Sequence, residues 1–170
     1  MSGRKSDSQL VKKTVKAIDE SLSILQQADK YIHNPILDNQ HVAKARELSH
    51  KLHKGQLRDD GKTYTSHTDK VAEILSLVTD NPDVISAGFL HDSIEDGKIT
   101  IAELRSLVGD RVADLVVEVT KKGTNCFPNL KSREALLIKF ADRLQNLSDM
   151  EGWTPERQQA YMNKSVFWSR

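Results

Sequence analysis

The stretch GFLHDSIED, residues 88–96, decides the fold. The residues just before its histidine are apolar, and their spacing predicts a buried helix over 82–95. Four ionisable groups then follow within six residues: His91, Asp92, Glu95 and Asp96. Residues four apart share one face of a helix, so His91 should face the same way as Glu95, and Asp92 the same way as Asp96. Taken alone, this pattern fits either a metal site or a solvated run of charges.

Helical periodicity extends outward from this segment in both directions, with apolar residues at steps of three and four. Helices are expected at 8–33, 38–54, 66–79, 82–95, 101–108, 110–120, 132–150 and 155–168. Thr100 and Glu103 form a capping-box pattern, Asp110 can cap the following helix, and Thr154-Pro155 marks the start of the last one. The β-branched run over 112–120 has no partner strand and is assigned to a helix. The sequence therefore predicts an all-α fold.

An amphipathic helix is expected at the N-terminus, ended by Asn34-Pro35. Its apolar stripe comprises Val11, Val15, Ile18, Leu22, Leu25 and Ile32. Two interpretations stay open: the stripe packs against the rest of the domain, or it makes a homo-oligomer. We divide the chain into this helix, residues 1–35, and a single helical domain, residues 36–170.

Composition limits the class of partner. The 170 residues carry a formal net charge of +1, which gives no support for binding nucleic acid. No apolar run has the length of a membrane span. The single cysteine, Cys126, has no partner for a disulfide within the chain, and no signal peptide is evident. These features favour a protein of the reducing cytoplasm.

The segment LLIKFADRLQNLSDM, residues 136–150, is the second informative stretch. Its core face is expected to be formed by Leu136, Leu137, Phe140, Leu144 and Leu147. Asp142 and Asn146 are four apart, which suits either a metal ligand beside a substrate-facing amide or an exposed polar patch. His67, at the start of its helix, offers a second imidazole. Two imidazoles and two carboxylates suit Mn²⁺, Fe²⁺ or Zn²⁺, but spacing alone does not bring them together.

Four motifs in order resemble the HD superfamily, and in particular the alarmone hydrolase domain of the RelA/SpoT family, including its small stand-alone members. They are HKGQLR with GKTYTSH (53–58 and 61–67), GFLHDSIED (88–96), EVTK (118–121) and IKFADRLQNL (138–147). The resemblance runs from about residue 43 to residue 150. It implies a single HD-domain helical bundle behind the N-terminal helix.

The resemblance also implies roles for individual residues. His67, His91, Asp92 and Asp142 would bind one divalent metal, usually Mn²⁺ in this branch, with Zn²⁺ or Fe²⁺ as alternatives. Glu95 and Asp96 would position and activate water. Arg58 and Asn146 would contact a nucleotide. The implied reaction removes the 3′-diphosphate of ppGpp or pppGpp, giving GDP or GTP and pyrophosphate.

The chain departs from the family pattern around the substrate and not at the implied metal ligands. The departures are Asp59, Thr68, Gly97, Ser148 and Asp149. Two alternatives therefore stay open: an HD phosphohydrolase of another nucleotide phosphate ester, and a catalytically weak domain that binds a nucleotide or a partner. No synthetase or regulatory region is present in the sequence, so a hydrolase without synthetase activity is expected.

Overall fold

The computed structural model describes residues 34–121 and 128–164, together with Lys16. Within this part of the chain the regular elements are helices, which confirms the all-α prediction. In order they are η1 (Pro35–Asp38), α2 (Gln40–Leu52), α3 (Tyr64–Ser76), α4 (Pro82–Leu90), α5 (Ile101–Val108), α6 (Asp110–Val119), α7 (Arg133–Ser148), η2 (Met150–Gly152) and α8 (Pro155–Lys164). No helix among these residues is long and apolar enough to cross a membrane. The predicted N-terminal helix lies outside the described residues, so the division at residue 35 stays a prediction.

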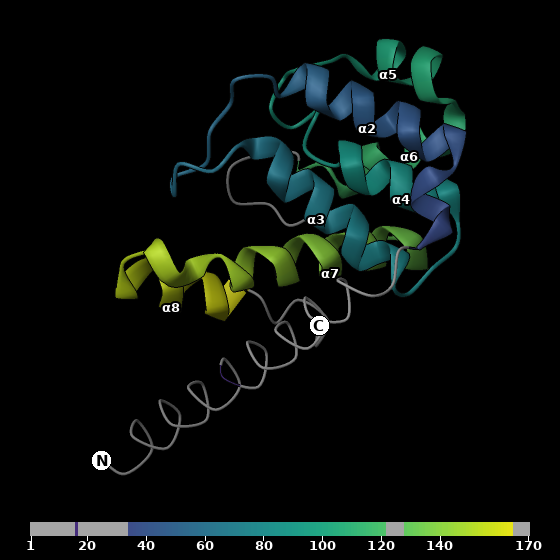
Figure 1. Ribbon diagram of the computed structural model, residues 1–170. Coiled ribbons are helices and arrows are strands. Elements are labelled where there is room, and N and C mark those ends of the chain that lie inside the picture. The colour runs from purple at the N-terminus through teal and green to yellow at the C-terminus, as the bar shows by residue number, and fades with distance from the viewer. Residues whose placement is uncertain (1–15, 17–33, 122–127, 165–170) are drawn as a thin grey trace.

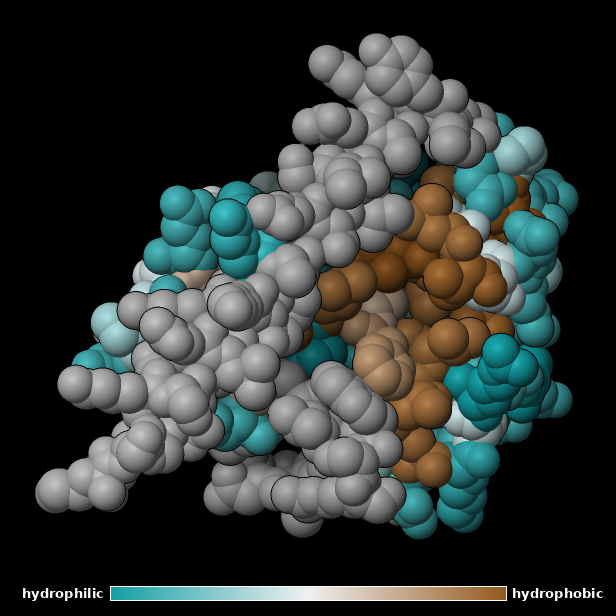
Figure 2. Space-filling model, turned by 90° about the horizontal axis from the view of Figure 1, so that it is seen from below, coloured by the Kyte–Doolittle hydropathy of each residue, from teal (hydrophilic) through white to brown (hydrophobic). Residues whose placement is uncertain are grey.

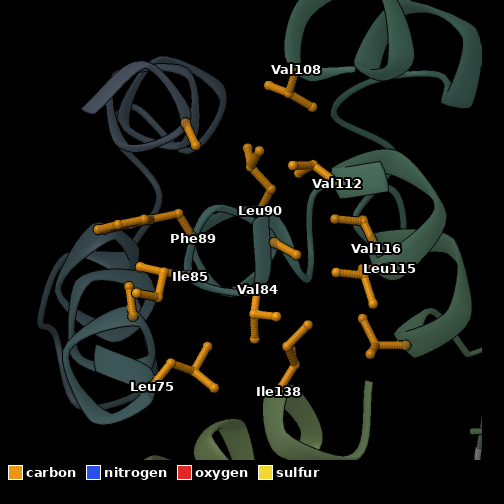
Figure 3. Packing of buried hydrophobic residues seen from close by; sticks show 14 of the residues in the cluster. Leu75, Val84, Ile85, Phe89, Leu90, Val108, Val112, Leu115, Val116 and Ile138 are labelled. Atoms are coloured by element: carbon orange, nitrogen blue, oxygen red, sulfur yellow. The ribbon is translucent and has the colours of Figure 1, made fainter. Parts of the chain in front are cut away.

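Helix α4 lies at the centre of the domain (Figures 1 and 3). All seven residues from Val84 to Leu90 are buried, so the helix needs apolar cover on every side. Helices α2, α3, α6 and α7 pack against it. The side chains around it in Figure 3 include Leu75 of α3, Val112, Leu115 and Val116 of α6, and Ile138 of α7. This central position holds the end of α4, and with it His91, inside the protein.

Helices α3 and α4 approach closely at Gly88. A Cβ added to Gly88 would lie 2.4 Å from Cδ1 of Leu75, and the nearest backbone atom, Cα of Ala72, is 3.7 Å away. Real Cβ contacts are not that short, so Leu75 would have to move to admit a larger residue. Glycine at this point therefore leaves room for the Leu75 side chain between α3 and α4, close to His67 near the start of α3 and His91 just after α4.

The short connecting elements follow the sequence signals. Thr100 and Glu103 form the predicted capping box at the start of α5. The next helix does not use the predicted cap: its N-cap is Gly109, with φ +85°, and Asp110 is its first residue. The loop between α2 and α3 closes on itself through an antiparallel bridge between Leu57 and Thr63.

The prediction for the end of α4 was wrong, because the helix stops at Leu90 and residues 91–97 form turns. Two side chains use the carbonyls that a continuing helix would need. Nδ1 of His91 lies 2.8 Å from the carbonyl oxygen of Gly88, and the Ser93 hydroxyl donates to the carbonyl oxygen of Leu90 at 2.6 Å. Such local side-chain bonds compete with helix propagation. The expected shared face of His91 and Glu95 therefore does not exist.

The predicted core face of α7 was also wrong. The side that enters the core is formed by Ala135, Ile138 and Ala141, whereas Phe140 is 37% exposed. Leu137 packs partly against the core. Helix α7 has two apolar stripes, and small residues occupy the inner one because α7 approaches α3 and α4 closely there.

We predict that Leu90→Ala destabilises the domain by about 2–5 kcal/mol, since it removes a fully buried side chain from the central helix and leaves a cavity. Leu107→Ala is the matched control, because Leu107 is 59% exposed on α5. Urea unfolding of both variants measures the difference. Equal midpoints for the two variants would contradict the central role of α4.

Candidate metal centre

Two buried histidines face each other at the start of α3 and just after the end of α4. His67 lies in the first turn of α3, and His91 follows Leu90. Their Nε2 atoms are 3.3 Å apart, and the two residues are only 2% and 1% exposed. His67 and His91, which are 24 residues apart in the sequence, thus point their Nε2 atoms toward each other.

The opposite ring atom of each histidine is bonded to an oxygen. Nδ1 of His91 lies 2.8 Å from the carbonyl oxygen of Gly88, and Nδ1 of His67 lies 2.5 Å from Oε1 of Gln145. A carbonyl oxygen only accepts, so each Nδ1 carries the hydrogen. When the imidazoles are neutral, each facing Nε2 atom therefore carries a lone pair. Metal-binding histidines are arranged in this way, with the other ring nitrogen donating to an acceptor.

The orientation of the Gln145 amide follows from its other neighbours. Its Nε2 donates to Oδ2 of Asp149 at 2.7 Å, and its Oε1 also accepts from Nη1 of Arg58 at 3.3 Å. A carboxylate cannot donate and a guanidinium cannot accept, so the amide oxygen must point toward His67. Gln145 therefore fixes the tautomer of His67.

Two carboxylates complete the cluster. Oδ2 of Asp92 lies 3.0 Å from Nε2 of His91 and 3.8 Å from Nε2 of His67. Oδ1 of Asp142 lies 3.6 Å from each of these nitrogens. Ligand atoms of His67, His91 and Asp142 all lie within 4.8 Å of one another. The structure thus brings together His67, His91, Asp92 and Asp142, the four residues that the family resemblance implied as ligands.

The charge of the cluster calls for a cation. Burial favours the neutral form of His91, but the charge of Asp92 and hydrogen bonding to Asp142 and Asp92 outweigh it and raise the pKa of His91 to about 10. Burial also lowers the pKa of His67, and the neighbouring His91 lowers it further. The two carboxylates are therefore balanced by the ammonium of Lys139, which bonds Asp142, and by one further positive charge among the clustered atoms, either a proton or a metal ion. Two imidazoles and two carboxylates fit a borderline divalent ion.

Three polar side chains fix the carboxylates. The Tyr64 hydroxyl donates to Oδ2 of Asp92 at 2.5 Å, and Lys139 and Asn146 donate to the two oxygens of Asp142 at 3.2 and 2.7 Å. Burial and the charge of Asp92 raise the pKa of Tyr64, so its hydroxyl stays a donor. Sequence reasoning missed Tyr64, Lys139 and Gln145; the three-residue spacing of Lys139 and Asp142 on one helix was the available signal.

Arg58 and Asn146, for which the resemblance implies contacts with a nucleotide, lie in direct contact with each other. Nη2 of Arg58 donates to Oδ1 of Asn146 at 2.8 Å, although the two residues are 88 apart in the sequence. Asn146 in turn donates to Asp142. A guanidinium and an amide thus lie directly beside the histidine-aspartate cluster, where they can contact an anionic group.

Glu95 and Asp96 lie on the turns after α4 and point to different neighbours. Oε1 of Glu95 pairs with Nζ of Lys121 at 2.7 Å, and Oε2 accepts from the backbone N–H of Lys121 at 3.3 Å. Oδ2 of Asp96 accepts from Nε2 of Gln56 at 3.1 Å and lies 4.0 Å from Nδ1 of the buried His53. No described ion pair joins either acid to the four clustered residues.

The acidic departures from the family pattern are each paired with a cation. Asp59 lies 2.6 Å from Nη1 of Arg157 on α8, and Lys62 bridges Asp60 and Asp149 at 3.0 and 3.1 Å. Asp59 and Asp60 therefore do not add uncompensated negative charge beside Arg58. Thr68 is buried and accepts a hydrogen bond from Ser49 at 3.2 Å, so it serves packing between α2 and α3.

A helical domain with a buried His, His-Asp and Asp cluster at its centre defines the HD class of metal-dependent phosphohydrolase folds. The comparisons agree with this class. The family model described as an HD domain matches residues 45–125. Among solved structures, a metazoan ortholog of SpoT that hydrolyses ppGpp has a TM-score of 0.65 and 28% sequence identity, covering 75% of this chain and 82% of that one.

Curated relatives point the same way. A probable guanosine-3′,5′-bis(diphosphate) 3′-pyrophosphohydrolase of Synechocystis is 31% identical over 74% of this chain and 19% of its own length. The protein of that description from Mycoplasma pneumoniae is 35% identical, over 74% of this chain and 20% of its own. A GTP pyrophosphokinase of Myxococcus xanthus is 34% identical, over 76% and 19%. This chain spans about a fifth of the length of these relatives. The chain belongs to the HD superfamily, and its domain is of the RelA/SpoT alarmone hydrolase type.

We predict that Gln145→Leu weakens the binding of a divalent metal by about 10–100-fold, the usual effect of removing the group that orients a histidine ligand. Leucine keeps most of the volume but leaves Nδ1 of His67 without its acceptor. Gln159→Leu on the exposed side of α8 is the control. Isothermal titration calorimetry of the metal-free proteins with Mn²⁺ measures the affinities. Equal affinities of Gln145→Leu and the wild-type protein would show that Gln145 does not orient a metal ligand.

Proposed function

We propose that this protein is a metal-dependent phosphohydrolase that removes the 3′-diphosphate of ppGpp and pppGpp, giving GDP or GTP and pyrophosphate. The observation that carries the proposal is the pair of facing His67 and His91 Nε2 atoms between two carboxylates, with Arg58 and Asn146 alongside. The hydrolysis of ppGpp by the metazoan SpoT ortholog, and the probable activity of the Synechocystis relative, support the choice of substrate. We further propose Mn²⁺ as the metal and the cytoplasm as the location.

Under this proposal, His67, His91, Asp92 and Asp142 hold the metal. A divalent ion at such a site lowers the pKa of water and neutralises charge on phosphoryl oxygens. Lys139 bonds Oδ2 of Asp142 and leaves Oδ1 as the oxygen near the histidines, whereas Tyr64 bonds Oδ2 of Asp92, the oxygen that itself lies near them. They act by holding Asp142 and Asp92 in place.

Arg58 binds the anionic substrate, because its guanidinium is fixed by Gln145 and Asn146 and can bond a phosphate with its remaining N–H groups. Hydrolysis consumes one water, cleaves the ester linkage at the ribose 3′ oxygen and releases pyrophosphate. The 3′ oxygen takes up a proton, and the attacking water loses one. Glu95 is the proposed acceptor of that proton, and Asp96 orients Glu95 or the water.

The ion pair of Glu95 with Lys121 has a consequence for this role. Each carboxylate oxygen of Glu95 accepts one bond from Lys121 and keeps a further lone pair that can take a proton. Lys121 therefore holds the Glu95 carboxylate in place without blocking its proposed role as the proton acceptor.

A second candidate is an HD phosphohydrolase of another nucleotide phosphate ester. The observation that favours it is Asp59, an acidic departure from the family pattern directly after Arg58, which pairs with Arg157 so that this position adds no positive charge for a highly charged substrate. The two candidates differ in their product. The test is an assay of the purified protein with Mn²⁺ against a nucleotide panel that includes ppGpp, with phosphate and pyrophosphate measured separately.

Pyrophosphate from ppGpp supports the proposed function, and orthophosphate from another nucleotide supports the second candidate. Tight binding without turnover would contradict both and leave a nucleotide-binding domain.

We predict that Glu95→Gln lowers turnover by about 10²–10⁴-fold, because it keeps the shape of the side chain and removes the proton acceptor. Its metal content should stay at the wild-type level, whereas His91→Ala should lose metal and activity together. Metal analysis of the purified variants distinguishes the two effects. Glu47→Gln, on the exposed side of α2, controls for the loss of one negative charge. Loss of metal from Glu95→Gln would make Glu95 a ligand or a structural support, and would end its proposed role as the base.

A further inference from the structure

The side chain of Gln56 joins the buried His53 to Asp96 through two hydrogen bonds. Its Oε1 lies 3.0 Å from Nδ1 of His53, and its Nε2 donates to Oδ2 of Asp96 at 3.1 Å. A carboxylate only accepts, so the amide nitrogen must face Asp96 and the amide oxygen must face His53. Nδ1 of His53 therefore carries the hydrogen and donates it to Gln56. The three side chains form a chain of hydrogen bonds that ends on Asp96.

His53 is the buried end of this chain. Its side chain has no exposed surface, and its ring stacks on that of Tyr64 with a centroid distance of 4.7 Å. Among the described residues, its Nε2 is buried without a hydrogen-bond partner. A hydrogen on Nε2 would be a buried donor without an acceptor, which is unfavourable. Burial thus favours the tautomer in which Nδ1 donates to Gln56.

The backbone of Gln56 is also held in place. Its N–H donates to the carbonyl oxygen of His53 at 3.0 Å, and its carbonyl oxygen accepts from the N–H of Tyr64 at 2.9 Å. The Tyr64 hydroxyl donates to Asp92, whereas the Gln56 amide donates to Asp96. The loop before α3 and the first residue of that helix therefore hold two acids that are four residues apart in the sequence.

Asp96 is held at one of its two carboxylate oxygens. Oδ2 accepts from Gln56, and within the described part of the chain no hydrogen bond or ion pair occupies Oδ1. The N–H of Asp96 donates to the carbonyl oxygen of Asp92 at 2.9 Å, which keeps Asp96 next to a proposed metal ligand. Polar side chains at a domain surface usually bond water on all sides, as those bordering the apolar area in Figure 2 can. Asp96 instead has one fixed oxygen and one that is open to water.

We propose that Gln56 and His53 are positioning residues for Asp96. His53 fixes the orientation of the Gln56 amide, and Gln56 holds one oxygen of Asp96 so that the other can orient Glu95 or the attacking water. This inference rests on the proposed function of Asp96 in hydrolysis. No described hydrogen bond or ion pair joins Gln56 or His53 to the four clustered residues, so the two should affect turnover without affecting metal content.

A double-mutant cycle of Gln56→Leu and Asp96→Ala tests the proposal, with the nucleotide that the wild-type protein hydrolyses. Gln56→Leu should lower kcat by about 10–100-fold, the usual effect of removing a group that orients another, with KM and Mn²⁺ content unchanged. In the Asp96→Ala background the same change should have no further effect, because the group that Gln56 holds is gone. Gln159→Leu, the matched control, loses a surface hydrogen bond to Asn163 and should keep the wild-type kcat. An equal loss of kcat in both backgrounds, or a change in KM alone, would overturn the proposal.

Two variants of His53 separate its hydrogen bond from its packing. His53→Asn and His53→Leu both remove the ring that stacks on Tyr64 and introduce side chains of similar size. Only the asparagine amide keeps a donor near the position of Nδ1. The kcat of His53→Asn should exceed that of His53→Leu by about tenfold, the effect of one retained hydrogen bond. Equal kcat values would show that His53 does not act through Gln56.

The side-chain amide of Gln56 gives a readout that needs no substrate. Its NMR signals in a proton–nitrogen correlation spectrum, assigned by their loss in Gln56→Leu, should shift in Asp96→Ala and in His53→Leu. They should shift less in His53→Asn. Unshifted signals in Asp96→Ala would overturn the proposal. If the wild-type protein hydrolysed no nucleotide, the proposed function would fail, whereas these signals would still decide whether Gln56 holds Asp96.

Discussion

The two Nε2 atoms of His67 and His91 that face each other across 3.3 Å are the constraint on which the rest of the site depends. Both histidines are held in the tautomer that places a hydrogen on Nδ1, by Gly88 and Gln145. When both rings are neutral, these nitrogens carry lone pairs that repel each other, so a proton or a metal ion near them stabilises the pair. Asp92 and Asp142 add negative charge at the same point. The cluster is therefore built to hold a positive charge in the interior of the domain.

The fold supplies this arrangement by placing the ends of three helices together. The glycine at position 88 leaves room for the Leu75 side chain of α3, and the same residue supplies the carbonyl oxygen that orients His91. Helix α7 brings Asp142, and one turn later Gln145 and Asn146, to the opposite side. Core packing and site geometry thus share residues, so a change that shifts α4 also shifts a proposed metal ligand.

Much of the architecture could be predicted from the sequence, because helix signals are local. The capping box at Thr100 and Glu103 is an example in which two side chains determine where a helix begins. The end of α4 was mispredicted because the Ser93 hydroxyl and the His91 ring compete for carbonyls, and periodicity does not register that competition. The inner face of α7 was mispredicted because leucines and small residues both follow a helical repeat. Periodicity cannot tell which of two apolar stripes faces the closer neighbour.

For the site, the proposed metal ligands could be predicted from the sequence, but the residues that orient them could not. The resemblance suggested the four clustered residues with Arg58 and Asn146, since it carries information about distant parts of the chain that spacing does not. It gave no sign of Tyr64 or Gln145 as the groups that orient ligands, or of Lys121 as the partner of Glu95. These contacts join residues far apart in the sequence, and they depend on the three-dimensional packing of α3, α7 and the turns after α4.

The central claim is that one divalent ion lies among these four residues. Anomalous diffraction at the manganese edge, from crystals of the protein grown with Mn²⁺, tests it most directly. The account predicts a peak about 2 Å from Nε2 of His67, Nε2 of His91 and a carboxylate oxygen each of Asp92 and Asp142. A well-ordered cluster with no peak, or a peak at other residues, would contradict it.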